Sequence, residues 1–118
     1  MRIEELDKEI EFHDLPLSEV NYSFEKRELI LKIAAYNEGN QNYDYYNIIF
    51  NAVEKLIFDC PEKLELKESN GNINTYEVSE INEVYSIKIV ILLNLNGPPA
   101  ILQFSYTNIK KVYLHSGD

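Results

Sequence analysis

The sequence predicts a mainly β protein: an antiparallel β-sandwich or flattened barrel built from two related meanders, with or without one short helix. Apolar and polar residues alternate through much of the chain, which is the pattern of half-buried strands. The pattern occurs twice, over residues 18–58 and again over residues 79–114. With 118 residues, 45% of them apolar, the chain is expected to form a single domain (1–118) whose core needs no disulfide or metal.

The two copies match in their order of segments more than in residue identity. Each begins with a similar tetrapeptide, continues with an alternating apolar run and a loop that contains glycine, and ends with a third apolar piece. A repeated strand pattern indicates an architecture and carries no information about chemistry. The matching segments are residues 18–21 with 79–82, 29–35 with 87–93, and 46–58 with 102–114.

The elements of the first half follow from this periodicity. Residues 1–10 carry Ile3, Leu6 and Ile10 at helical spacing, which predicts an amphipathic helix. Residues 20–24 and 28–35 alternate in the manner of strands, and the short polar connection between them predicts a hairpin.

A polar stretch, residues 37–42, then separates this hairpin from a third strand that begins near Tyr43 or Tyr45 and continues through Phe50. The apolar pattern restarts at Val53, which predicts a bulge or a short bend between strands, with a one-turn helix as the alternative. Leu64 and Leu66 predict a strand that enters a turn at residues 70–72.

The second half repeats this plan, with one ambiguous segment and one unusual strand. Residues 76–84 fit either a strand or a helix. Residues 87–93 predict a strand, followed by a loop at 94–99, but apolar side chains fall on both of its faces. Because an exposed strand of this kind would aggregate, we expect it to be fully buried or to form a dimer interface.

The composition narrows the classes of partner. Twenty acidic and eleven basic residues give a net charge of −9, which disfavours binding to nucleic acid and favours a basic protein partner. Acidity that serves solubility alone is the alternative. The longest apolar run is five residues, so no membrane span is expected. A single cysteine, Cys60, and the charged N-terminal residues favour the cytoplasm.

Groups that could carry catalysis are few. The chain has two histidines, His13 and His115, and the one cysteine, Cys60. It contains no zinc-ligand spacing, no glycine-rich phosphate loop and no G-x-S-x-G motif. We therefore expect no enzyme, no metal and no cofactor. An enzyme would require His13, Asp14 and Cys60 to converge in the fold.

The segment Tyr43-Asp44-Tyr45-Tyr46 is the strongest candidate for a partner-binding surface. It places aromatic rings beside an acid at the start of a strand, and tyrosines are favoured in interfaces because they bury a large area at low entropic cost. The alternative is that alternate tyrosines of the segment face the core. At least one of the tyrosines must then point outward.

A second motif, Phe12-His13-Asp14, precedes the first hairpin. Together with the strand that contains Leu29-Ile30-Leu31-Lys32-Ile33, it resembles the opening of small bacterial all-β families, some of which are similar to immunity proteins encoded beside polymorphic toxins. The resemblance covers residues 11–58. It implies a protein that neutralises a toxin partner. The alternative is that His13 and Asp14 serve only the turn, through hydrogen bonds to the backbone.

Three functions are compatible with these observations. The first is a cytoplasmic protein-binding module, an immunity-type protein that neutralises a basic partner by occlusion. The second is a structural domain that self-associates through residues 87–93 or a sheet edge, with a homodimer as the product. The third is a barrel that binds a small molecule between its two halves.

Overall fold

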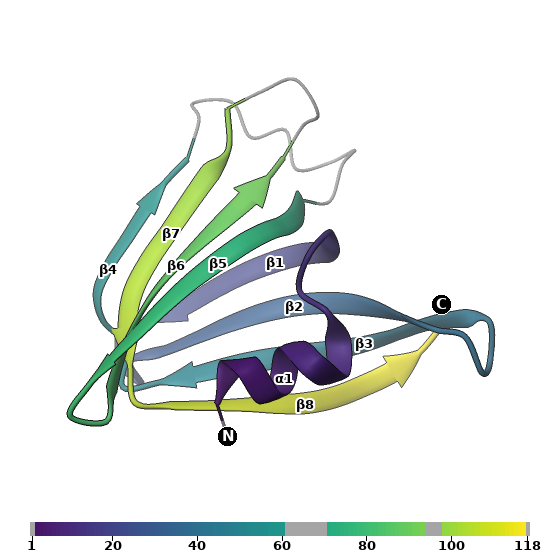
Figure 1. Cartoon of the computed structure of the whole chain (residues 1–118), viewed down its shortest axis with the longest axis horizontal. Helices are drawn as coiled ribbons and strands as arrows, with labels where there is room; N and C mark the ends of the chain where they lie inside the picture. The colour runs from purple at the N-terminus through teal and green to yellow at the C-terminus, as the bar shows by residue number, and fades with distance from the viewer. Residues whose placement is uncertain (1, 61–70, 94–97, 118) are drawn as a thin grey trace.

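The computed structural model describes residues 2–60, 71–93 and 98–117, and it confirms the mainly β class. Within these ranges, one helix and eight antiparallel strands form a single sheet that does not close into a barrel (Figure 1). The elements are α1 (Ile3–Ile10), β1 (Leu15–Ser23), β2 (Glu28–Asn37), β3 (Asn42–Asn51), β4 (Glu54–Asp59), β5 (Gly71–Ile81), β6 (Val84–Leu92), β7 (Ala100–Tyr106) and β8 (Asn108–Ser116).

The order of strands in the sheet is symmetric between the two halves of the chain. It runs β4-β7-β6-β5-β1-β2-β3-β8. If each of β1 to β4 is replaced by its counterpart among β5 to β8, and the reverse, the result is the same order read from the other edge of the sheet. In each half the first three strands form a meander, and the fourth strand pairs with the other half, β4 with β7 and β8 with β3. The halves therefore exchange their last strands, which leaves β4 and β8 at the two edges of the sheet.

The sheet folds back on itself, so that its two halves enclose the core. The ring of Phe50 on β3 lies 4.9 Å from the rings of both Phe104 and Tyr106 on β7, although these strands lie near opposite ends of the sheet order. These contacts are edge-to-face, an arrangement that aromatic rings favour. The central strands contribute alternate buried side chains, which are Leu29, Leu31 and Ile33 from β2 and Ile87, Ile89 and Ile91 from β6.

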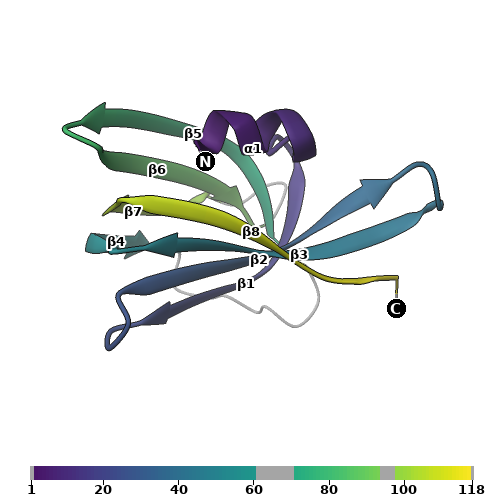
Figure 2. The same cartoon turned by 90° about the horizontal axis from the view of Figure 1, so that it is seen from below.

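Helix α1 covers the inner face of the sheet, as its spacing of apolar residues predicts (Figures 1 and 2). Ile3, Leu6 and Ile10 are buried, so the apolar side of the helix joins the core. Its polar side contacts two distant strands. The hydroxyl of Tyr76 on β5 donates to Asp7 at 2.9 Å, and the ammonium of Lys111 on β8 donates to Glu9 at 2.7 Å. The helix therefore bridges the two halves of the sheet.

The chain bends between β3 and β4, and no helical turn forms there. Ala52 has a φ of 56°, and the N–H of Val53 donates to the carbonyl of Arg27 at 2.9 Å. The side chain of Val53 is buried, so a hydrogen bond and a core contact both hold the bend. The bend predicted at this position is confirmed, and the one-turn helix is wrong.

The ambiguous segment at residues 76–84 is extended. It completes β5 at Ile81, turns at Asn82 and Glu83, which have φ values of 52° and 66°, and enters β6 at Val84. Two central residues with positive φ match the twist of the flanking strands in a two-residue hairpin.

In β6 the second apolar face is only half-buried, at Val90 and Leu92. Dimerisation through this face stays a prediction. The strand predicted at Leu64 and Leu66 lies outside the described residues, as do residues 94–97 of the predicted loop.

Candidate functional site

The four residues of the tyrosine segment divide between the two faces of β3. Asp44 and Tyr46 share the inward face with Ile48 and Phe50, whereas Tyr43 and Tyr45 point outward. The reason is the alternation of side chains along a strand. The structure therefore has the arrangement given as the alternative, in which alternate residues of the segment face the core. Partner binding by this segment stays a prediction, and Tyr43 and Tyr45 are its outward residues.

The outward tyrosines belong to a larger group, which we call the outer aromatic cluster and define as Tyr36, Tyr43, Tyr45 and His115. Tyr36 on β2 meets Tyr43 edge-to-face, with ring centres 5.3 Å apart. Tyr45 stacks on His115 of β8 at 4.7 Å. Tyr36 is 56% exposed and Tyr43 is 42% exposed. Large aromatic rings that remain exposed in a group are typical of interaction surfaces.

The cluster lies at the end of a hairpin that projects from the sheet. Figures 1 and 2 both show the β2–β3 hairpin extending beyond the other strands. β1 follows β2 only as far as the pair Leu17 and Ile33, and then leaves it to pair with β5. The two strands diverge beyond that pair. The space between them is an open groove of about 490 Å³.

We call this space the tyrosine groove. One side is the end of α1 and the turn after it, and the other side is the projecting hairpin. Its lining includes Glu11, His13, Asp14, Pro16, Tyr36 and Tyr43. Two sequence motifs that lie far apart, the His-Asp dipeptide and the tyrosine segment, are therefore brought together by the fold.

Three carboxylates, those of Glu9, Glu11 and Asp14, line the groove together with one lysine, Lys8. Glu9 is paired with Lys111 at 2.7 Å, and Asp14 lies 3.3 Å from the ring nitrogen of His13. Within the described residues, no ion pair engages the exposed carboxylate of Glu11. Aromatic faces beside carboxylates, of which that of Glu11 is unpaired, suit the side chains of arginine and lysine, through cation–π contacts and charge-assisted hydrogen bonds.

Asp44 is buried beneath the outer aromatic cluster, where its carboxylate joins a network of hydrogen bonds. It is only 9% exposed, and its carboxylate accepts hydrogen bonds from Ser116 Oγ at 2.5 Å and from Asn37 Nδ2 at 3.0 Å. These two donors hold the pKa of the Asp44 carboxyl below its usual range. The hydroxyls of Ser116 and Tyr113 lie 2.6 Å apart and extend the network.

The Phe12-His13-Asp14 triplet forms the turn from α1 to β1. Phe12 is buried against the ring of Tyr76, and its N–H donates to the carboxylate of Asp7 at 2.7 Å. Asp14 has a φ of 62°, and its N–H donates to the carbonyl of Ile73 at 2.7 Å. The side chains of His13 and Asp14 are exposed on the rim of the groove.

The described contacts do not bring His13, His115 and Cys60 together. His13 Nδ1 lies 2.8 Å from the carbonyl oxygen of Asn74, His115 stacks on Tyr45, and Cys60 follows the edge strand β4. Burial raises the pKa of the Cys60 thiol, which lowers its reactivity at neutral pH. Among the described residues, no group of three or more His, Cys, Asp or Glu side chains could hold a metal ion.

The part of the chain covered by the structure also includes no helix of the length and apolarity needed to span a bilayer.

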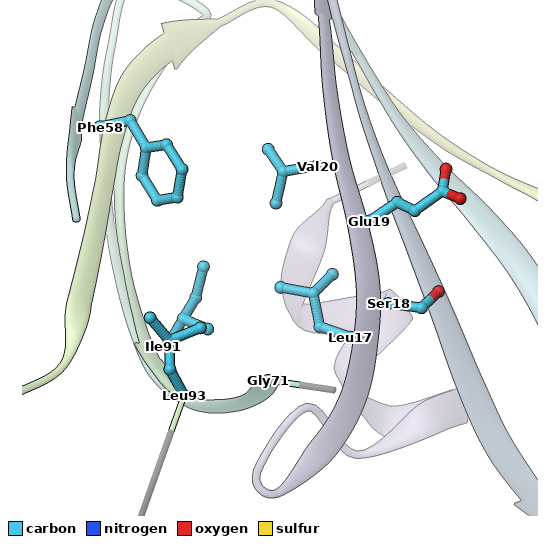
Figure 3. Close-up of a pocket in the computed structure, with 8 residues that line it drawn as sticks. All are labelled: Leu17, Ser18, Glu19, Val20, Phe58, Gly71, Ile91 and Leu93. Carbon is cyan, nitrogen blue, oxygen red and sulfur yellow. The ribbon is translucent and has the colours of Figure 1, made fainter. Parts of the chain in front are cut away.

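A separate apolar pocket lies between β1, β4 and β6, with a volume of about 110 Å³ (Figure 3). Leu17, Val20 and Phe58 point into it, whereas the carboxylate of Glu19 points away. Pockets for drug-sized ligands measure roughly 300 Å³ or more. This pocket has room for one small apolar group.

Compared with known proteins, the chain matches no family, no curated protein and no solved structure. The evidence for function therefore comes from the geometry of the chain.

Proposed function

We propose that this protein is a cytoplasmic protein-binding module of the immunity type, which neutralises a basic partner by occluding part of its surface. The observation that carries the proposal is the tyrosine groove, where Tyr36 and Tyr43 are exposed beside the carboxylates of Glu11 and Asp14. Carboxylates accelerate encounter with a basic partner, and desolvated aromatic anchors slow its dissociation. Neither role requires the protein to be an enzyme.

The first partner to test is the product of the reading frame immediately upstream of this gene, because immunity-type proteins are encoded beside their toxins. Its affinity for the purified protein can be measured by calorimetry with two variants. The double variant Tyr36→Ser/Tyr43→Ser should bind at least about thirtyfold more weakly. Phe24→Ser is the matched control, since Phe24 is 87% exposed in the turn between β1 and β2, away from the groove. Equal loss in both variants, or no binding at all, would reject the proposal.

Charge reversal tests the electrostatic part. Glu11→Lys/Glu38→Lys reverses two exposed acids at the groove and at the tip of the projecting hairpin. Glu25→Lys/Glu83→Lys reverses two exposed acids in other turns and changes the net charge equally. The groove variant should lower the association rate and flatten its dependence on salt, and the control should do so much less. If both variants behave alike, only the overall charge matters and the groove is not the site.

Self-association is a second candidate, favoured by the open edge of the sheet. β8 is an edge strand of nine residues on which Val112, Tyr113 and Leu114 are exposed. Such an edge can pair with a second copy. Light scattering of the purified protein separates the two candidates. A dimer that Leu114→Lys dissociates would support self-association, and a monomer at all concentrations would reject it.

The small size of the apolar pocket argues against a small-molecule ligand and thereby favours a protein partner. Its small volume, and the open sheet in place of a closed barrel, leave little enclosed space between the halves.

A further inference from the structure

We propose that the free edge of β2 in the tyrosine groove binds an extended segment of the partner that carries arginine or lysine, and that this segment adds to the sheet as a strand. The inference rests on the proposed function and specifies how its partner binds. It concerns the backbone of β2, in addition to the aromatic and acidic side chains around it.

The edge exists because β1 is shorter than β2 on this side. β1 pairs with β2 over residues 17–23, opposite residues 28–33. Residues 34–37 of β2 continue into the projecting hairpin, where the described strands pair with them only on the β3 side. Pro16, across the groove, has no N–H with which to close the gap. A short stretch of β2 is therefore left with an open edge inside a groove.

The backbone groups on this edge can be assigned from the alternation of the strand. In an antiparallel strand, alternate residues direct both N–H and C=O to the same neighbour. The carbonyl of Lys32 faces β1, because it accepts a hydrogen bond from Ser18 Oγ at 3.2 Å. Ala34 and Tyr36 have the same parity as Lys32, so their N–H and C=O groups face the open edge. Ala35 and Asn37 face β3.

The side chains around this edge select the chemistry of the added strand. Glu11 and Asp14 lie on one side of the groove, where carboxylates outnumber the single lysine, Lys8, and Tyr36 and Tyr43 lie on the other. A strand laid along β2 would place alternate side chains toward these groups. Cationic side chains at those positions would meet carboxylates and ring faces together, in a chain whose net charge is −9.

The other edges of the sheet suit a basic strand less well. The edge strand β8 carries Lys110 and Lys111, which repel a cationic segment. β4 is only six residues long, and its pairing with β7 is irregular between Glu54 and Ile57. Lys side chains, short strands and irregular pairing are ways in which proteins protect an edge. The open edge of β2 is also short, but residues 34–37 themselves carry no lysine, and they pair with β3 without a register shift.

The test uses the wild-type protein and synthetic peptides of about eight alternating arginine and threonine residues, a length that spans the edge. The first peptide is unmodified, and the other two carry N-methyl groups on alternate backbone amides, one in each register. Amide hydrogen exchange is followed by NMR. On binding the first peptide, exchange at Ala34 and Tyr36 should slow, while Ala35 and Asn37, bonded to β3, should be protected with or without peptide. Methylation in one register should weaken binding at least about tenfold.

Three outcomes separate this inference from the proposed function. Slowed exchange at Ala34 and Tyr36 together with the loss on methylation supports strand addition. Equal affinity for all three peptides, with binding that Tyr36→Ser/Tyr43→Ser still removes, overturns strand addition and leaves the groove as the site. No binding of any peptide overturns the inference, and binding of the upstream protein then decides the proposed function independently. Ala34→Pro, compared with Ala34→Val, adds a check that removes one edge N–H.

Discussion

Asp44 on β3 and Ser116 at the end of β8 are joined by a hydrogen bond of 2.5 Å that lies on the inner face of the sheet. β8 is an edge strand, so its last residues have a neighbour on one side only. The N–H of Gly117, next to Ser116, also donates to the carbonyl of Tyr43 at 2.8 Å. Asp44 therefore anchors the C-terminal end of the sheet beneath the outer aromatic cluster.

The Asp44 anchor should make stability depend on pH in acid. Ser116 and Asn37 hold the pKa of Asp44 below its usual range, so its contribution is present above the unfolded pKa of about 3.9 and is lost as pH falls through the lower folded value. Asp44→Asn should lower the urea midpoint at neutral pH. The difference from wild type should shrink below about pH 4. Urea titrations over this range measure it.

Ser116→Ala provides the comparison for that experiment. It removes the donor that lowers the pKa of Asp44 most. Its urea midpoint should fall in the same direction as that of Asp44→Asn, and the double variant should lose less than the sum of the two. Additive losses would show that the two residues stabilise the fold separately.

The orientation of the tyrosines predicts a division between binding and stability. Tyr46 packs on the core, with the ammonium of Lys111 5.1 Å from the centre of its ring, whereas Tyr43 is exposed. Tyr46→Ser should lower the free energy of unfolding by about 2 kcal/mol, and Tyr43→Ser should change it by less than about 0.5 kcal/mol. Chemical denaturation measures both. A large loss in Tyr43→Ser would mean that its ring is part of the fold and cannot be treated as a free anchor.

Much of the fold can be predicted from local sequence patterns, because a strand with one buried face has alternating apolar residues. Alternation along residues 28–35 predicts β2, and the spacing of Ile3, Leu6 and Ile10 predicts α1. The exchange of β4 and β8 between the halves has no local signal, because strand pairing across the halves is decided by the shared core. Only the recurrence of the apolar pattern pointed to the equivalence of the two halves in the sheet.

In the candidate site, too, some features could be predicted from local patterns and others could not. The parity of Ile48 and Phe50 could have assigned Asp44 and Tyr46 to the inward face, since side chains alternate along a strand. The groove itself could not be predicted, because it forms where β1 leaves β2 and brings residues 8–16 beside residues 34–43. His115 joins the outer aromatic cluster only because β8 pairs with β3.

Helix α1 should stabilise the sheet mainly through Leu6, which is completely buried. Leu6→Ala removes apolar contacts and leaves a cavity, so the free energy of unfolding should fall by about 2 to 5 kcal/mol. Glu5→Ala, at an exposed position of the same helix, is the control and should change stability by less than about 0.5 kcal/mol. Thermal unfolding followed by circular dichroism distinguishes the two. A small effect at Leu6 would mean that the sheet is stable without the helix.

The bond between Tyr76 and Asp7 should give a second pH dependence, at the alkaline end. Burial and the Asp7 carboxylate raise the pKa of Tyr76 to about 12. A raised pKa means that the contribution is complete below the unfolded value of about 10 and is lost as pH rises through about 12. Tyr76→Phe should cost about 1 to 2 kcal/mol at neutral pH, and the cost should vanish in strong alkali. Tyr36→Phe, at an exposed tyrosine, is the control and should change stability by less than about 0.5 kcal/mol at neutral pH.

Tyr106 predicts a substitution that stabilises the protein. Its side chain is 1% exposed, and its hydroxyl has no hydrogen-bond partner among the described residues. Burial without a partner raises the pKa of this hydroxyl and costs about 1 to 3 kcal/mol. Tyr106→Phe keeps the ring, which contacts Phe50 and stacks on Tyr85, and removes the unpaired group. The free energy of unfolding should therefore rise by about 1 kcal/mol in urea titrations.

The matched control for Tyr106→Phe is the same substitution at Tyr85, whose ring stacks on that of Tyr106. Burial and the neighbouring Glu80 carboxylate raise the pKa of the Tyr85 hydroxyl, so Tyr85→Phe removes a hydroxyl with a polar neighbour and should lower stability or leave it unchanged. The two variants delete the same atom from stacked rings, one fully buried without a partner and the other half-buried beside a carboxylate. If Tyr106→Phe destabilised the protein as much as Tyr85→Phe, the Tyr106 hydroxyl would have to be bonded to a buried water. A gain confined to Tyr106→Phe would establish that the core tolerates an unsatisfied hydroxyl at a measurable cost.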